Sequence, residues 1–173
     1  MLKKIMGMAL VVGMSVNMCY ADIADDGVKT PTEKDYQSAV KKLIKACDSG
    51  DVLGCYHLGV MHEEGVGIQQ DYFKAAELYQ KACKDRVVKG CFDLGSMYVK
   101  GRGVKQNIFK AVELYQKACK GGEADGCYNL GVMYNNGEGV KQNNTIALKY
   151  FGMACDMKVK EGCENYAELK NKR

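Results

Sequence analysis

Apolar residues recur at helical spacing through most of this chain, and the pattern returns every 36 residues, as from Cys47 to Cys83. In each copy an Asp or Asn is followed by apolar residues three and four positions apart, which predicts an N-cap and an amphipathic helix. The four predicted helical stretches are 35–47, 71–83, 107–119 and 143–155. Their expected N-cap residues are Asp35, Asp71, Asn107 and Asn143.

A second helix is predicted after each of these stretches, for example over Cys91-Phe-Asp-Leu-Gly-Ser-Met-Tyr98. A glycine recurs in the middle of this helix, at Gly59, Gly95 and Gly131, where it costs about 1 kcal/mol relative to alanine. We expect close packing against a neighbouring helix to offset that cost. The Gly-x-Gly segments that follow indicate helix ends, because glycine readily adopts the left-handed conformation.

Two cysteines stand eight residues apart in every copy, and a glycine precedes the second. Without Cys19 the chain has eight cysteines, for which 105 pairings exist in principle. The translational symmetry of the repeats singles out one of them. The predicted disulfides are Cys47–Cys55, Cys83–Cys91, Cys119–Cys127 and Cys155–Cys163. Zinc binding is the alternative use, but the spacing is too long for a zinc knuckle and the chain has only two histidines, so no metal is expected.

Alternating helices at a fixed period predict an all-α fold, a right-handed α/α solenoid braced by disulfides. A single hairpin cannot bury its apolar face, so each repeat needs its neighbours. The expected solenoid covers residues 35–173. Its units are a half-unit 35–50, repeats 51–86, 87–122 and 123–158, and a capping half-unit 159–173.

Residues 1–21 have the features of a signal peptide: Lys3 and Lys4, then an apolar run, then small residues up to Ala21. A membrane anchor is the alternative, although the run is shorter than the ~20 residues of a span. A lipoprotein is a second alternative, but the residues before Cys19 are not the small residues expected before a lipidated cysteine. We therefore predict a secreted or periplasmic protein, with a flexible segment over residues 22–34.

The formal net charge of +4 is small for 173 residues, and the basic residues are dispersed. This distribution gives no reason to expect nucleic acid or, after signal cleavage, a membrane as partner. The Gly-x-Gly segments follow helices and not strands, so they do not indicate a phosphate site, and no cofactor is expected.

The recurring motif is Gly-Cys-x-x-Leu-Gly-x-Met-Tyr, then Gly-x-Gly-Val, then Lys-Ala-x-x-Leu-Tyr-x-Lys-Ala-Cys. It resembles the Sel1-like repeat, a relative of the tetratricopeptide repeat, over residues 35–167. The paired cysteines make the chain similar to the Helicobacter cysteine-rich proteins. The resemblance implies either a scaffold that holds a peptide or protein partner on its concave face, or a penicillin-binding protein with slow β-lactamase activity, whose ligand would be a β-lactam or a peptidoglycan-related molecule.

Ser38 and Lys41 form the Ser-x-x-Lys motif of serine β-lactamases, in which the lysine helps to activate the serine. The companion Ser-Asp-Asn and Lys-Thr-Gly motifs are absent from the sequence. In the repeat alignment both residues fall on the polar face of their helix. They remain the candidate catalytic pair, and the enzymatic activity stays an alternative.

One position of the second helix is polar in each copy while its surroundings stay constant, which is what a binding surface needs. The candidate partner-binding residues are therefore His57, Asp93, Asn129 and Asn165. His62 aligns with two tyrosines and is expected to pack in the core. The leading hypothesis is a disulfide-rich scaffold that binds a peptide or protein partner.

Overall fold

The computed structural model describes residues 31–172, and over this range the chain forms eight helices and no strands. Their bounds are α2 (Glu33–Asp48), α3 (Val52–Glu64), α4 (Tyr72–Lys84), α5 (Val88–Lys100), α6 (Ile108–Lys120), α7 (Ala124–Asn136), α8 (Asn144–Asp156) and α9 (Lys160–Asn171). The predicted all-helical fold is confirmed. The expected signal peptide and most of the segment 22–34 lie outside the described residues.

Polar N-caps start three of the helices as predicted. The side chains of Asp71 and Asn107 each accept a hydrogen bond of 3.0 Å from the third backbone amide that follows, and Asn143 caps α8 in the same way. These bonds satisfy backbone N–H groups that have no partner within the helix.

The predicted N-cap at Asp35 is wrong, because α2 begins two residues earlier, after Thr32. Thr32 and Asp35 form a capping box, in which the Asp35 carboxylate accepts hydrogen bonds of 2.7 Å from both the backbone N–H and the hydroxyl of Thr32. This reciprocal pair holds the additional residues in helical conformation.

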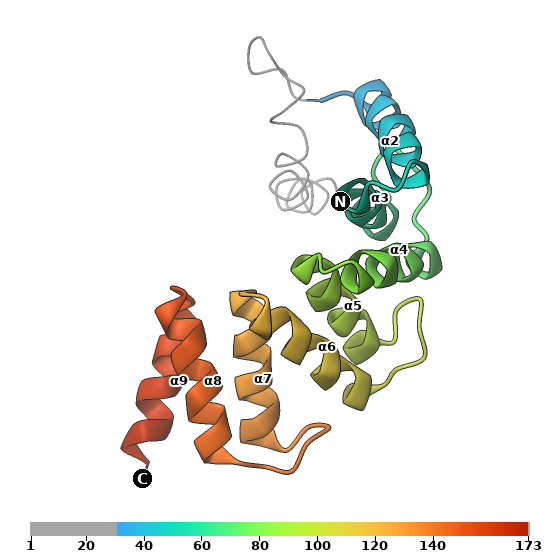
Figure 1. Cartoon of the computed structure of the whole chain (residues 1–173). Helices are drawn as coiled ribbons and strands as arrows, with labels where there is room; N and C mark the ends of the chain where they lie inside the picture. Colours follow the sequence, from blue (N-terminus) through green and yellow to red (C-terminus); the bar gives the residue numbers. More distant parts are fainter. Residues whose placement is uncertain (1–30, 173) are drawn as a thin grey trace, which may run out of the picture.

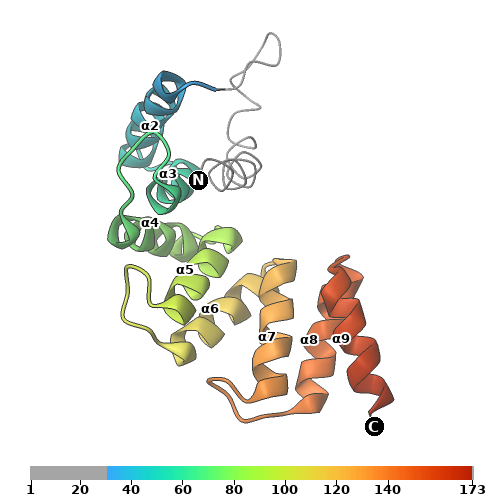
Figure 2. The same cartoon turned by 180° about the vertical axis from the view of Figure 1, so that it is seen from behind.

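Each helix packs chiefly against its neighbours in sequence, and the successive hairpins follow a curved path from α2 to α9 (Figure 1). The view from behind shows the same order (Figure 2). The buried apolar residues form four clusters in series, each of which joins only adjacent helical layers. The core is therefore extended along the chain, as expected for a solenoid.

The mid-helix glycines allow the close packing that the sequence predicts. A Cβ atom added at any of them would lie within 3.0 Å of an aromatic ring on the following helix, too close for an ordinary contact. The facing pairs are Gly59 with Tyr79, Gly95 with Tyr115, and Gly131 with Phe151. The aromatic rings occupy the space that a side chain would fill.

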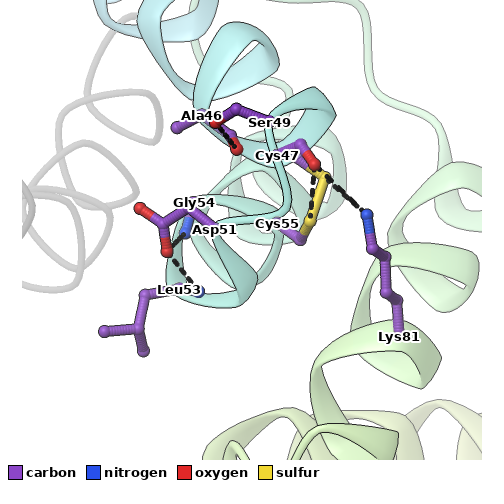
Figure 3. The surroundings of a disulfide bond; sticks show 8 residues. All are labelled: Ala46, Cys47, Ser49, Asp51, Leu53, Gly54, Cys55 and Lys81. Atoms are coloured by element: carbon purple, nitrogen blue, oxygen red, sulfur yellow. Dashed lines mark hydrogen bonds between the residues drawn. A yellow bond between two sulfur atoms is a disulfide. The ribbon is translucent and has the colours of Figure 1, made fainter.

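All four predicted disulfides are present, with Cα–Cα distances of 4.5–4.6 Å. Each joins the end of one helix to the first turn of the next, and Figure 3 shows the first of them. There the Lys81 ammonium, on α4, donates a 3.2 Å hydrogen bond to the Cys47 carbonyl and lies 3.7 Å from the Cys47 sulfur. The disulfides brace the joints between repeats, and the chain-entropy treatment assigns about 2.5 kcal/mol to a loop of this size.

Candidate partner-binding groove

The α3–α5 groove is an open hollow of about 610 Å³ formed by α3, α5 and the start of α7. Its lining residues are Leu53, Tyr56, His57, Val60, Val87, Lys89, Phe92, Asp93, Glu123 and Asp125. On α3 these side chains come from positions spaced three and four apart, so they share one face of the helix. The 36-residue period places corresponding positions of α5 beside them.

An aromatic ladder supports this face. Each ring that projects from the first part of α3, α5 or α7 packs on a ring of the following helix, with centroids 5.6–5.9 Å apart. The pairs are Tyr56 with Tyr79, Phe92 with Tyr115, and Tyr128 with Phe151. The second ring of each pair is buried in the core, so the ring beside the groove has a fixed position.

Asp93 is a partly buried carboxylate in this groove. Burial raises its pKa from 3.8 to about 7, and the nearby carboxylates of Glu63 and Glu123 add to this effect. A hydrogen bond with the Tyr56 side chain and the charge of Lys89 oppose it. Asp93 is therefore only partly ionised at pH 7, and a cation bound nearby would favour its charged form.

His57 lies against Tyr56, with ring centroids 5.2 Å apart. Burial lowers the pKa of its imidazole, and the charge of Lys89 lowers it further, while Asp51 acts in the opposite direction. The lowered pKa favours the neutral form of the ring at pH 7. The predicted residues His57 and Asp93 come together in one groove, as neighbours from successive repeats.

The other two predicted residues lie elsewhere. Asn165 lines a separate α7–α9 groove of about 250 Å³, where its side-chain amide donates a 3.4 Å hydrogen bond to the Tyr128 hydroxyl. Asn129 lines neither groove and hydrogen-bonds the side chain of Tyr115. Asp93 and Asn165 each bond the hydroxyl of a tyrosine in the preceding repeat, Tyr56 and Tyr128 respectively. The corresponding residue in the repeat before Asn129 is Phe92, which has no hydroxyl to bond.

Several groove residues were missed by the sequence analysis, among them Lys89, Glu123 and Asp125. The signal was present, because the position that holds Lys89 carries leucine in the copy before and aspartate in the copy after. The position of Glu123 varies in the same way, with aspartate, valine and glutamate in successive copies. Variation between copies would have selected these positions, but the requirement for a polar residue in each copy excluded them, because Leu53 and Val87 are apolar.

The candidate catalytic pair does not form part of this site. Ser38 and Lys41 both lie on α2 with exposed side chains, and neither lines the α3–α5 groove. The hypothesis of β-lactam hydrolysis therefore gains no support from the described residues.

Neither a metal site nor a membrane span is found among the described residues, 31–172. No group of three or more His, Cys, Asp or Glu side chains is arranged to hold a metal ion in this range. No helix within the same residues is long and apolar enough to cross a membrane.

The fold and the braced joints define the class of protein, an α-solenoid of helical hairpins with a short disulfide loop at each joint. The family model of the Sel1 repeat matches residues 20–51, 52–85, 88–123 and 124–159. The chain therefore belongs to the Sel1 repeat family, and the resemblance seen in the sequence is confirmed.

Three solved structures illustrate the similarity. Helicobacter pylori cysteine rich protein B is 32% identical, with a TM-score of 0.61, over 78% of this chain and 96% of that one. A Sel1 repeat protein from Oxalobacter formigenes is 26% identical, with a TM-score of 0.73, over 76% of this chain and 54% of that one. A protective antigen present in uropathogenic Escherichia coli strains is 29% identical, with a TM-score of 0.76, over 78% of this chain.

This chain spans 29% of the length of the E. coli antigen and about half the length of the Oxalobacter protein. A search of curated proteins finds no significant match. The chain is a disulfide-rich scaffold of Sel1 repeats, and Sel1 repeat proteins generally bind proteins. Four structural disulfides fit a protein that resides outside the cytoplasm.

Proposed function

We propose that this protein is a secreted or periplasmic scaffold that binds a peptide segment of a protein partner in the α3–α5 groove. The observation that carries the proposal is the variation of the groove positions between repeats whose packing positions are constant. Leucine, lysine and aspartate occupy one such position at Leu53, Lys89 and Asp125. A constant core beneath a varied surface suits recognition of one particular partner.

The shape and the lining of the groove support a peptide as the ligand. It is open to solvent and offers apolar side chains beside charged ones, a combination that segments of protein use for recognition. Each of its helices, α3, α5 and α7, is tied by a disulfide to the helix that precedes it, so little conformational entropy is lost from the scaffold on binding.

Export belongs to the same proposal. Removal of residues 1–21 would leave the eight paired cysteines and remove Cys19, and an oxidising compartment would keep the four disulfides formed. The proposed organisation is then residues 22–32 as a leading segment, followed by the solenoid of half-unit, three repeats and capping half-unit, which begins with α2 at Glu33.

A comparison of two double variants tests the function. The groove variant is His57→Ala with Asp93→Ala, and the control is Ser38→Ala with Lys41→Ala, on the exposed surface of α2. Proteins captured from extracellular and periplasmic extracts by the oxidised wild type should be lost with the groove variant and kept with the control. Circular dichroism checks that both variants remain helical. Equal capture by the groove variant would contradict binding at this site.

A further inference from the structure

The α3–α5 groove is acidic, although the protein as a whole is basic. The lining carries three carboxyl groups, from Asp93, Glu123 and Asp125, against one ammonium, from Lys89, whereas the whole chain has a net charge of +4, or +2 (23 − 21) without Lys3 and Lys4. Asp93 is partly ionised at pH 7, because its pKa is raised to about 7, and burial lowers the pKa of the His57 imidazole, which favours its neutral form. The groove therefore attracts a positively charged group and repels an anionic one.

One ammonium in the groove, that of Lys89, faces these carboxyl groups, and its charge acts on both Asp93 and Glu123. The ion pairs Lys74–Glu77, Lys160–Glu164 and Glu168–Lys172 are exposed and lie outside the groove. Burial raises the pKa of Glu123, and Asp125 acts in the same direction, while the charge of Lys89 opposes them. A cation placed between Asp93 and Glu123 would relieve this unfavourable burial of like charges.

Apolar surface lies beside the acidic part of the groove. Leu53 is 55% exposed at its edge, and Val60, Val87 and Phe92 continue the apolar lining. The rings of Tyr56 and Phe92 can also receive a cation on their faces. A ligand that fits both parts has a cationic group adjacent to an aliphatic or aromatic one.

From this complementarity we infer that the groove binds a peptide segment with a lysine or arginine next to an apolar residue. The cationic side chain lies against Asp93 and Glu123, and the apolar one lies against Leu53 and Val87. This inference rests on the proposed function, and it specifies the partner. Nucleic acids and acidic peptides do not fit, because their charge has the same sign as the groove.

A library of displayed random heptapeptides, selected on the oxidised protein, tests the inference while the natural partner is still unidentified. Sequences with lysine or arginine beside a large apolar residue should be enriched. Titration of a fluorescent copy of the most enriched peptide then gives Kd. Replacing its lysine by acetyl-lysine, or its arginine by citrulline, should weaken binding about tenfold or more, as expected for a charged hydrogen bond to a partly buried carboxylate.

Asp93→Asn should weaken binding of the same peptide by a similar factor. Asp156→Asn is the matched control, since it makes the same change of net charge at an exposed residue at the end of α8, outside the groove. It should leave Kd within about twofold, because an exposed distant charge is screened by salt. Equal weakening by both variants would overturn the inference, since it would show attraction to net charge alone.

Binding should also tighten between pH 6.5 and pH 8, because the pKa of Asp93 is raised to about 7. The groups that act on Asp93 are Tyr56 and Glu63 of α3, Tyr79 of α4, Lys89 of α5, Tyr115 of α6 and Glu123 before α7. The lowered pKa of His57 favours its neutral form, so most of the change should come from Asp93 and should be lost in Asp93→Asn. An unchanged pH dependence in that variant would count against Asp93 as the cation's partner.

The selection separates the failure of this inference from that of the proposed function. Enriched peptides that lack a cation but lose binding to His57→Ala with Asp93→Ala would overturn the inference and leave the function standing. Enriched peptides that still bind this double variant, or a complete failure to enrich any peptide, would overturn both.

Discussion

The joints between repeats are constant in sequence, whereas the residues of the α3–α5 groove differ from one repeat to the next. Each joint has the same parts, a disulfide and a glycine whose added Cβ would lie within about 3.0 Å of an alanine Cβ on the preceding helix, as at Gly90 and Ala82. The groove, one helical turn away, has different residues at the same positions of successive repeats. Stability therefore depends on the constant positions, which leaves the variable ones free to determine what is bound.

The largest effect on stability should come from removing the disulfide at one joint. Replacing Cys83 and Cys91 together by serine should reduce the free energy of unfolding by about 2.5 kcal/mol, since the bridge no longer restricts the unfolded chain. Chemical denaturation of the oxidised variant and wild type measures the difference. Peptide binding in the groove should survive under native conditions, and its complete loss would show that joint and groove are not separable.

A smaller loss of stability is expected from a substitution where two helices approach most closely. Gly131→Ala would place a Cβ 2.5 Å from the Phe151 ring, so overpacking should cost about 2 kcal/mol. Gly152→Ala is the control, because its Cβ would lie at an ordinary 3.4 Å from Tyr166, and alanine should raise helix stability by about 1 kcal/mol. The midpoint temperature of unfolding should therefore fall for Gly131→Ala and rise for Gly152→Ala. A shift in the same direction for both variants would contradict the tight contact at Gly131.

Within the groove, a substitution should stabilise the protein. Because the pKa of Asp93 is raised from 3.8 to about 7 in the folded state, its contribution to stability falls as pH rises through that window. Asp93→Asn should be more stable than wild type by on the order of 1 kcal/mol at pH 8, and about equal to it at pH 4, with water access limiting the gain. Chemical denaturation of both proteins at each pH value measures the difference in stability. An Asp93→Asn variant less stable than wild type at pH 8 would contradict the unfavourable burial of the Asp93 carboxylate.

The smallest effect is expected at the edge of the groove. Leu53→Ala should change the free energy of unfolding by less than about 0.5 kcal/mol, because this side chain is 55% exposed. The same variant should weaken binding of an apolar, cationic peptide. A substantial loss of stability would show that Leu53 is part of the solenoid core and not of the binding surface.

The sequence was sufficient to predict the solenoid and the disulfide pairs, because a strict period imposes the same contacts in every copy. It was insufficient wherever one copy differs from the others. Thr32 before Asp35 lengthens the first helix by a capping box, and Phe92 removes a hydroxyl, so that the Asn129 side chain bonds Tyr115 instead. Charges from different repeats, such as Asp93 and Glu123, become neighbours only through the stacking of hairpins.

The short spacing of the cysteines bears on how the protein acquires its covalent structure. Each native partner is eight residues away, whereas the nearest cysteine of another pair, as from Cys55 to Cys83, is 28 residues away (83 − 55). Shorter loops close at lower entropic cost, so the nearest thiol is also the correct one. Oxidation can thus proceed hairpin by hairpin as the chain emerges, and we expect it to need little help from a disulfide isomerase.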